Sequence, residues 1–432
     1  MIAAWLAGLI GCQPTPLAVD PERWTPPADP LNVLLISVDT LRRDALGRYG
    51  GAGDMPWLDG WLSRGLTLDS HASCSSWTVP SMACALSGMD TLDLGFAPVG
   101  GEDSLALEAQ TLADRFRATG YATALVTANT YLADPAGLGR GYQVWTEVGN
   151  AKAEQVVDLG LTEARVLAAM RSPWLLHLHF MDPHIPYQEP ITDEALLASL
   201  PAIDVDLADA AQARGLENRW ATLSASERTD YLRWTAALYG AQNRYLDGEL
   251  ERLMATLEGE GLLEDTVVVF LTDHGEQFNE HDSIFHGKSL YAEEVASVAS
   301  FHGPGVSPGG VEAPTTHADI LPTLLDLTGW RLTDDLTGAA VTDGTNSTDE
   351  RSIFAARVYE AGAIQSVRRG GWELIYRWDG GAELFAADDA GQQADRLAEE
   401  PAVAAALWDQ LAPQVERLDA LRAGDGPLPP EL

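Results

Sequence analysis

The sequence predicts an α/β fold in which helices flank a mostly parallel central sheet, followed by a small C-terminal α+β subdomain. Three observations lead to this prediction. Four apolar runs have strand length, helical patterns separate them, and Asp or His residues follow several of the runs. Continuous apolar runs are typical of parallel strands that are buried on both faces. Because ligands of such folds bind beyond the carboxyl ends of the strands, residues that follow each run are candidate site residues.

The predicted elements alternate along the chain. Strands are predicted at 32–38, 122–127, 174–180 and 266–271, and helices at 105–119, 156–170 and 226–258. The stretch 333–350 is rich in Asp, Thr and Gly, which indicates a loop and a subdomain boundary. After it, short strands are predicted at 352–358, 363–368 and 372–377, and a closing helix at 403–421.

Composition narrows the classes of function. The 432 residues are 46% hydrophobic and 21% charged, so the chain can bury a large core. The 27 Lys and Arg residues against 64 Asp and Glu residues give a net charge of −37, which repels nucleic acid and anionic lipid headgroups. Nucleic acid is therefore not expected as a partner. An anionic substrate would need a local cation, and a bound metal ion supplies the densest one.

The N-terminus resembles an export signal. The apolar run 1–11 is too short to span a bilayer, and Leu9-Ile10-Gly11-Cys12 resembles the bacterial lipoprotein cleavage box. The absence of a basic residue before Arg23 departs from that pattern. We expect a lipoprotein-type signal at 1–12 and a Pro-rich tether at 13–30. The protein would then be exported to the bacterial cell envelope, facing the periplasm, with membrane contact only through its lipid anchor.

Polar residues at the strand ends suggest a metal site. Asp273 and His274 directly follow the run 266–271 and Thr272, and Asp39 follows the first strand. The third run likewise ends near His179 and His184. Mixed oxygen and nitrogen donors suit Zn²⁺ or Mn²⁺, whereas Ca²⁺ prefers oxygen alone. Taken singly, each residue could instead be a capping Asp or a surface His.

Thr78 precedes a short predicted helix at 81–87 that closes on Gly88. We expect Thr78 to be the N-cap of this helix, with Pro80 in its first turn. An anionic group at this position is stabilised by the helix dipole. If a metal ion also contacts the Thr78 hydroxyl, that hydroxyl can ionise and attack phosphorus or sulfur. A plain N-cap is the alternative interpretation.

Together these residues resemble the sulfatase family, within the alkaline phosphatase superfamily. The resemblance rests on several motifs in the family's order: NVLLISVDTLRRDALGRYG, SWTVPSMACALSG, HFMDPHIPY, LTDHGEQFNEHDSIFHGKSLYAEE and ADILPTLLDLTG, then WELIYR and AELF near the C-terminus. It implies a catalytic domain at 31–332, followed by a boundary loop and C-terminal subdomain at 333–432.

The resemblance also implies roles for individual residues. The implied metal ligands are Asp39, Thr78, Asp273 and His274, with Thr78 also the nucleophile. Around the ester, the implied residues that contact its anionic oxygens or protonate the leaving group are His184, His286 and Lys288. A divalent metal ion is the implied cofactor.

The sequence departs from the sulfatase pattern Cys-x-Pro-x-Arg, in which the Cys is oxidised to formylglycine. Thr78 stands at the Cys position and Met82 at the Arg position, so formylglycine cannot form. A direct attack that gives a phospho-threonine is the available route, as in the threonine-using phosphodiesterases and the phosphoethanolamine and phosphoglycerol transferases of the superfamily. Thr40 stands where many sulfatases have a second Asp, which favours Zn or Mn and leaves Ca possible.

Three functions therefore compete. The preferred one is a metal-dependent hydrolase or transferase that acts on phosphate or sulfate esters of a small molecule, lipid or glycan. The second is a genuine sulfuric ester hydrolase, and the third is an inactive, sulfatase-like binding protein of the envelope. The substrate itself would be set by loops such as 188–229. Cys74 and Cys84 flank Thr78 and could form a disulfide or remain two buried thiols.

Overall fold

The computed structural model describes residues 27–91, 93–94, 109–132, 137–333, 335–342, 350–358 and 362–423. The proposed signal at 1–12 and most of the tether lie outside these residues, as do the start of the predicted helix at 105–119 and residues 334 and 343–349 of the predicted loop at 333–350. Among the described helices, none combines the length and the apolar composition that crossing a membrane requires.

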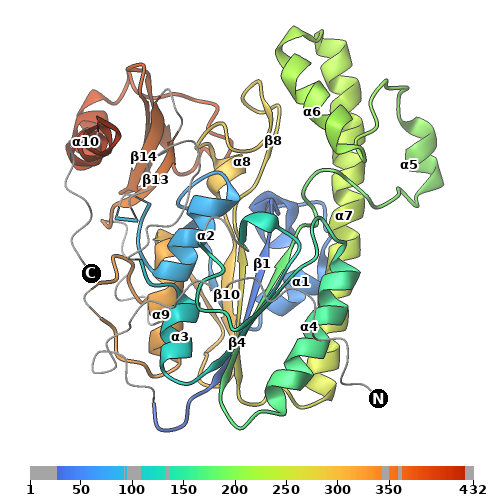
Figure 1. Ribbon diagram of the computed structural model, residues 1–432. Coiled ribbons are helices and arrows are strands. Elements are labelled where there is room, and N and C mark those ends of the chain that lie inside the picture. Colours follow the sequence, from blue (N-terminus) through green and yellow to red (C-terminus); the bar gives the residue numbers. More distant parts are fainter. Residues whose placement is uncertain are drawn as a thin grey trace.

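The central element is an eight-stranded sheet, and it confirms the predicted fold class (Figure 1). Every neighbouring pair in the sheet is parallel except those of one strand, β10, which runs antiparallel to both of its neighbours. In spatial order the strands are β11 (Gly309–Val311), β2 (Leu66–Leu68), β10 (Ala299–His302), β7 (Thr266–Thr272), β1 (Asn32–Val38), β6 (Trp174–Phe180), β4 (Ala122–Thr127) and β5 (Val144–Glu147). The four predicted strands form the continuous block from β7 to β4.

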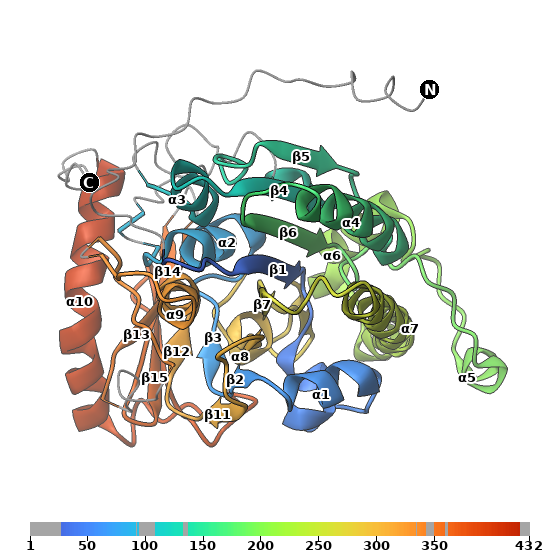
Figure 2. The same cartoon turned by 90° about the horizontal axis from the view of Figure 1, so that it is seen from below.

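Helices cover both faces of the sheet, and each face has its own apolar core (Figure 2). One face is covered by α2 (Thr78–Ser87), α3 (Leu112–Ala118) and α9 (Ile320–Leu327). The other is covered by α1 (Pro56–Leu62), α4 (Ala153–Ala168) and α7 (Ala225–Gly259). Because side chains alternate along a strand, Val33 and Leu35 of β1 pack toward α2, while Leu34 and Ile36 pack toward α7.

The helix α7 begins with a capping box. Ser224 Oγ accepts a hydrogen bond from the backbone N–H of Glu227, and the Glu227 carboxylate accepts one from the Ser224 N–H. Before α7 lies an excursion, the segment 188–224, that contains α5 (Glu194–Ser199) and α6 (Ala210–Arg219) and projects from one side of the molecule (Figure 1). It falls within the range expected to set the substrate.

The C-terminal subdomain is an antiparallel sheet of four strands covered by one long helix. The strands are β13 (Ile353–Val358), β14 (Ala363–Arg369), β15 (Trp372–Arg377) and β16 (Ala382–Ala386), and the helix is α10 (Pro401–Ala423). One sheet face packs on α10, and the other packs on Leu290, Tyr291 and Val295 of the main domain. The subdomain therefore rests on the chain segment that directly follows Lys288.

Shorter elements complete the described structure. These are η1 (Arg43–Ala45), η2 (Gly47–Tyr49), β3 (His71–Ala72), η3 (Thr130–Leu132), η4 (Trp220–Thr222), β8 (Gln277–Phe278), β9 (Ile284–Phe285), α8 (Ala292–Val295), β12 (Thr315–Thr316) and η5 (His317–Asp319).

Candidate active site

Strand register brings the polar strand ends together at one edge of the sheet. Val38, the last residue of β1, pairs with Phe180 of β6 and with Thr272 of β7. The pairing continues one residue further, because the backbone N–H of Asp39 donates to Phe180 O at 2.9 Å and that of Asp273 donates to Val38 O at 3.0 Å. Asp39 and Asp273 therefore leave neighbouring strands side by side, as the parallel topology predicts.

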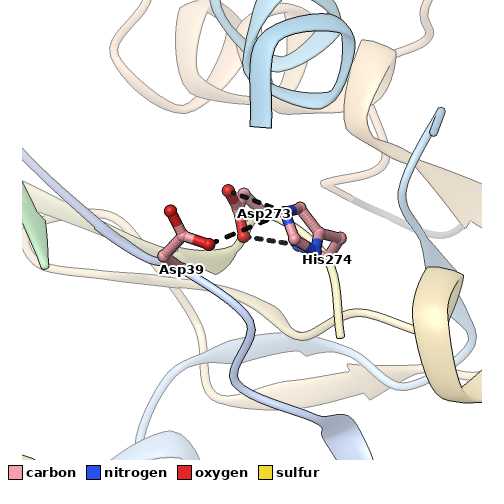
Figure 3. A group of neighbouring side chains, drawn as sticks. All are labelled: Asp39, Asp273 and His274. Carbon is pink, nitrogen blue, oxygen red and sulfur yellow. Dashed lines mark hydrogen bonds and ion pairs between the residues drawn. The ribbon is translucent and has the colours of Figure 1, made fainter. Parts of the chain in front are cut away.

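Asp39, Asp273 and His274 form a compact buried cluster (Figure 3). Their candidate ligand atoms all lie within 4.8 Å of one another, and His274 Nε2 lies 3.6 Å from both Asp39 Oδ1 and Asp273 Oδ2. Within the described structure these three atoms have no hydrogen-bond partner, although all three side chains are fully buried. An unpartnered buried polar atom costs about 1–3 kcal/mol. Two carboxylates and an imidazole facing one point are a donor set that a divalent cation satisfies.

The two carboxylates differ in their electrostatic surroundings. Burial alone would raise the pKa of Asp39, but the neighbouring His184, His179 and His274 outweigh it and hold that pKa below its usual range. Burial, followed by the charge of Asp39, raises the pKa of Asp273 well above its usual value. The site therefore holds two carboxylates that repel each other in the absence of a cation.

A tight turn after β1 braces this cluster. Thr40 has a φ of 53°, an uncommon left-handed conformation for a β-branched residue, and its backbone N–H donates to Asp273 Oδ1 at 3.2 Å. Tyr239 of α7 holds the turn from the other side, because its hydroxyl donates to Thr40 O and accepts from the Arg42 N–H, both at 2.8 Å. Strain of this kind persists where the surrounding structure fixes it, as at functional sites.

Thr78 lies at the start of α2, beside the cluster. Its Oγ1 donates a hydrogen bond to Asp39 Oδ2 at 3.4 Å. The expectation that Thr78 is the N-cap was wrong by one residue: Trp77, with φ of −158°, is the N-cap, and Thr78 is the first helical residue. The Thr78 side chain is directed to Asp39 rather than to the backbone N–H groups of its own helix. It remains in the first turn, where the helix dipole favours an anion.

His184 and His286 lie next to the cluster. The ring of His286 lies tilted against that of His274, with a centroid distance of 4.6 Å, and edge-on to that of His184, with a centroid distance of 4.9 Å. Burial lowers the pKa of both His184 and His286, so both imidazoles are favoured in their neutral form. Glu276 Oε2 lies 3.8 Å from His286 Nδ1, and burial raises the pKa of Glu276 to about 8.

Lys288 is near this group but is already paired. Its Nζ donates to Ile284 O at 2.7 Å and forms an ion pair with Glu217 Oε1 of α6 at 2.8 Å. The implied contact between Lys288 and an anionic substrate would therefore compete with Glu217. The same ion pair fixes the α5–α6 excursion to the rim of the site.

An aromatic pair and an arginine lie at the same rim. Trp77 packs edge-on against Tyr131 with a ring-centroid distance of 6.0 Å, and 52% of Tyr131 is exposed. Arg357 of β13 lies over the Trp77 ring at 5.0 Å and donates to Gly287 O at 2.9 Å. The C-terminal subdomain thus contributes a cation beside the candidate nucleophile.

Two further residues contact Asp39 and were assigned no role from the sequence. Asn129 Nδ2 donates to Asp39 Oδ2 at 2.7 Å, and His179 Nε2 lies 3.5 Å from the same oxygen. The sequence places His179 at the end of a predicted strand without a role, and it does not distinguish Asn129 from its neighbours. For His179, strand alternation was the available signal, because Leu175 packs toward α2 and residues an even number further along β6 share that face. Asn129 lies beyond the end of β4, where alternation gives no signal.

Cys74 and Cys84 are free, buried thiols, so the disulfide interpretation is wrong for this structure. Cys74 Sγ lies 3.4 Å from Thr316 Oγ1. Burial raises the pKa of Cys84 well above its usual value, which makes its thiolate, the reactive form, scarce. The two cysteines pack in the apolar core around α2.

Comparisons with known proteins find sequence similarity to sulfatases, and a similar fold in sulfatases and in a phosphonate monoester hydrolase. It is 29% identical over 246 residues to a choline-sulfatase of Rhizobium meliloti, covering 54% of this chain but only about half, 47%, of that relative. Its fold matches a phosphonate monoester hydrolase from Silicibacter pomeroyi, with a TM-score of 0.70, 21% identity and coverage of 91% and 95% of the two chains. It also matches a putative sulfatase from Bacteroides fragilis, with a TM-score of 0.71, 18% identity and coverage of 91% and 97%.

At these identities the two structural matches establish the fold alone. The family assignment comes instead from a family model described as sulfatase, which matches residues 31–330. That range contains the ligand cluster, Thr78, His184, His286 and Lys288. Since the match covers well over half of the chain, this protein belongs to the sulfatase family.

Proposed function

We propose that this protein is a metal-dependent hydrolase of phosphate or sulfate esters that uses Thr78 as its nucleophile. The observation that carries the proposal is the contact between Thr78 Oγ1 and Asp39 Oδ2 beside three unpartnered ligand atoms. A hydroxyl nucleophile, a helix N-terminus and a buried donor set converge within one site. Transfer of the same group to an acceptor other than water is a variant of this reaction.

Asp39, Asp273 and His274 are the residues that would hold the metal ion, with Thr78 Oγ1 next to them. A bound divalent cation supplies a positive charge that lowers the pKa of a neighbouring hydroxyl and draws in an anionic ester. Zn or Mn is favoured by the mixed donor set, and Ca is possible.

The chain's own residues support a two-step reaction. Thr78 Oγ1 loses its proton to solvent and bonds to the phosphorus or sulfur, while the bond from that atom to the ester oxygen breaks. The departing oxygen gains one proton, for which His184 and His286 are placed as relays to solvent. Water then attacks the phosphorus or sulfur of the modified threonine, the bond to Thr78 Oγ1 breaks, and that oxygen regains a proton as the water gives one up. Inorganic phosphate or sulfate leaves, or a phosphate monoester when the substrate is a diester.

Phosphate esters are the preferred substrates in this proposal. Threonine cannot be converted to formylglycine, and Met82 is fully buried in the core around α2, so it offers no polar contact in the site. The likeness to a choline-sulfatase favours the second candidate, a sulfuric ester hydrolase.

The residues at the rim of the site indicate which kind of leaving group the substrate carries. Trp77 and Tyr131 offer an aromatic surface, Arg357 adds a cation, and the α5–α6 excursion forms a further wall that Lys288 anchors. Such a rim suits the leaving group of a small-molecule, lipid or glycan ester.

Metal content and turnover test the proposal together. Purified full-length protein is analysed for bound metal, then assayed with an aryl phosphate, a bis-aryl phosphodiester and an aryl sulfate side by side, with and without chelator. We expect one bound divalent ion and chelator-sensitive turnover of at least one phosphorus ester. Turnover of the sulfate alone would select the second candidate, and metal binding without turnover of any ester would contradict the proposed function.

A further inference from the structure

Asn129 lies at the carboxyl end of β4, next to the candidate nucleophile. Thr127, the last residue of β4, pairs with His179 of β6, so the chain that follows β4 enters the same edge of the sheet as Asp39. Only 6% of Asn129 is exposed. It belongs to none of the motifs that identify the family in this sequence, and its place is visible only in the fold.

Three hydrogen bonds fix the side-chain amide of Asn129. Its Oδ1 accepts from the backbone N–H of Tyr131 at 2.9 Å. Its Nδ2 donates to Asp39 Oδ2 at 2.7 Å and to Thr78 Oγ1 at 3.3 Å. Because a backbone N–H can only donate, the oxygen of the amide must face Tyr131, and the NH₂ group must then face Asp39 and Thr78. The orientation of the amide is therefore set by the chain itself.

This arrangement divides the two oxygens of Asp39 between two tasks. Oδ2 accepts from both Asn129 and Thr78, whereas Oδ1 has no hydrogen-bond partner in the described structure and lies 3.6 Å from His274 Nε2. Asn129 thus holds Asp39 with one oxygen toward the nucleophile and the other toward the ligand cluster. The Oδ2 side of the carboxylate would then face an ester formed on Thr78, and the Oδ1 side would face a metal ion held by the ligand cluster.

The amide also contacts the reacting oxygen directly. Of the described residues, Asn129 alone donates a hydrogen bond to Thr78 Oγ1. When Thr78 loses its proton, its own bond to Asp39 Oδ2 is lost and leaves two anionic oxygens facing each other. An N–H donor aimed at both is then worth more than in the neutral state, because hydrogen bonds to charged groups are about twice as strong.

We propose that Asn129 is a catalytic residue that aligns Thr78 Oγ1 for attack and stabilises it as it becomes an anion. This inference rests on the proposed nucleophilic role of Thr78 and extends it to a residue on a different strand. The bond is made to a charge that develops during the reaction, so its loss lowers kcat more than it raises KM.

Two substitutions separate this role from a structural one. Asn129→Asp retains an oxygen that accepts from the Tyr131 N–H, so it preserves the support of the turn, and it replaces the donating NH₂ group by an oxygen that adds negative charge beside Asp39. Asn129→Ala removes the whole amide without adding a charge. The matched control is Asn32→Asp at the start of β1, where the Asn32 Oδ1 accepts from the Trp174 N–H at 3.1 Å at the opposite edge of the sheet.

Each full-length variant is characterised by its thermal midpoint, its bound metal and its kcat and KM for an aryl phosphate. We expect both Asn129 variants to bind metal and to lose kcat by about 10²–10³-fold with KM changed by less than about threefold, the cost of removing a preorganised donor. Asn32→Asp should have the kinetics of the unchanged protein. If Asn129→Ala unfolds, Asn129→Asp remains the deciding variant.

The outcomes distinguish this inference from the proposed function. If Thr78→Ala abolishes turnover but folded, metal-loaded Asn129→Asp keeps its kcat, the role of Asn129 is refuted and that of Thr78 stands. Loss of metal from Asn129→Ala would also refute it, since the amide would then act only through Asp39. If Thr78→Ala and both Asn129 variants all remain active, the nucleophile itself has been misassigned and the inference falls with it.

Discussion

Asp273→Asn should make the metal-free protein more stable and the metal-loaded protein less stable. In the metal-free site two buried carboxylates, Asp39 and Asp273, lie with ligand atoms within 4.8 Å of each other, and both have an oxygen without a hydrogen-bond partner. Asparagine has the same shape and its oxygen can still accept from the Thr40 N–H, which now bonds Asp273 Oδ1. The substitution therefore removes the repulsion and keeps the bond.

The magnitudes follow from that separation. Two unit charges about 5 Å apart repel by about 3 kcal/mol at an effective dielectric constant near 20. Partial protonation of Asp273, whose pKa is raised by burial and by Asp39, dissipates some of this repulsion. We expect the variant to gain about 1–3 kcal/mol without metal. Metal at 1,000 times its dissociation constant stabilises a native protein by about 4.1 kcal/mol, which exceeds the expected gain of the variant, and loss of one ligand from the site removes most of that stabilisation.

Chemical denaturation at neutral pH, in chelator and in excess Zn²⁺ or Mn²⁺, measures both effects. The unfolding free energies of the two proteins should change order when metal is added. Asp265→Asn is the matched control, because Asp265 is exposed and lies just before the other end of the same strand, β7. Two results would refute the assignment of Asp273 as a ligand. In one, the variant has a lower free energy of unfolding than the unchanged protein in chelator; in the other, added metal raises the free energy of unfolding of both proteins equally.

Three further expectations follow. Arg357→Ala should raise KM for an anionic ester about tenfold and leave kcat nearly unchanged, because the Arg357 cation lies at the rim; an unchanged KM would exclude this contact. Burial opposes protonation of His281, but its bond to Glu293 raises the pKa of His281 overall, so the protonated form stabilises the fold at low pH and this contribution fades as pH rises through that pKa. His281→Gln should therefore lower the free energy of unfolding more near about pH 5.5 than near about pH 8.5. Denaturation curves that show the larger loss at the higher pH would contradict this expectation. Cys12→Ser should move the protein from the membrane fraction to the soluble envelope fraction, whereas a wild-type protein that fractionates as soluble would exclude the lipid anchor.

The sequence predicted those parts of the fold and site that local pattern determines. Continuous apolar runs identified β1, β4, β6 and β7, and the residues after β1 and β7 supplied the ligand cluster. The missed strands of the central sheet are short: β2 and β11 have three residues each, and β5 and β10 have four. Segments of that length have too few residues for a period to appear, and pairing with long neighbours is what makes them strands.

Long-range contacts account for what sequence reasoning missed in the site. Asn129 follows β4 by two residues, and nothing local relates it to Asp39, 90 positions away. Lys288 was expected to meet the substrate, and its ion pair with Glu217 depends on how the excursion folds back. The N-cap was misplaced by one residue because the contact between Thr78 and Asp39 competes with capping, a choice that the isolated helix pattern does not encode.

The central claim is that Thr78 becomes covalently modified during turnover, and trapping that intermediate tests it most directly. Metal-loaded protein is mixed with an aryl phosphate, quenched in acid within the first turnovers, digested and examined by mass spectrometry, with Thr78→Ala assayed in parallel. We predict one phosphoryl group on Thr78 and a loss of several orders of magnitude in kcat for the Ala variant, with its metal still bound. An unmodified Thr78 peptide together with an active Thr78→Ala variant would contradict the claim.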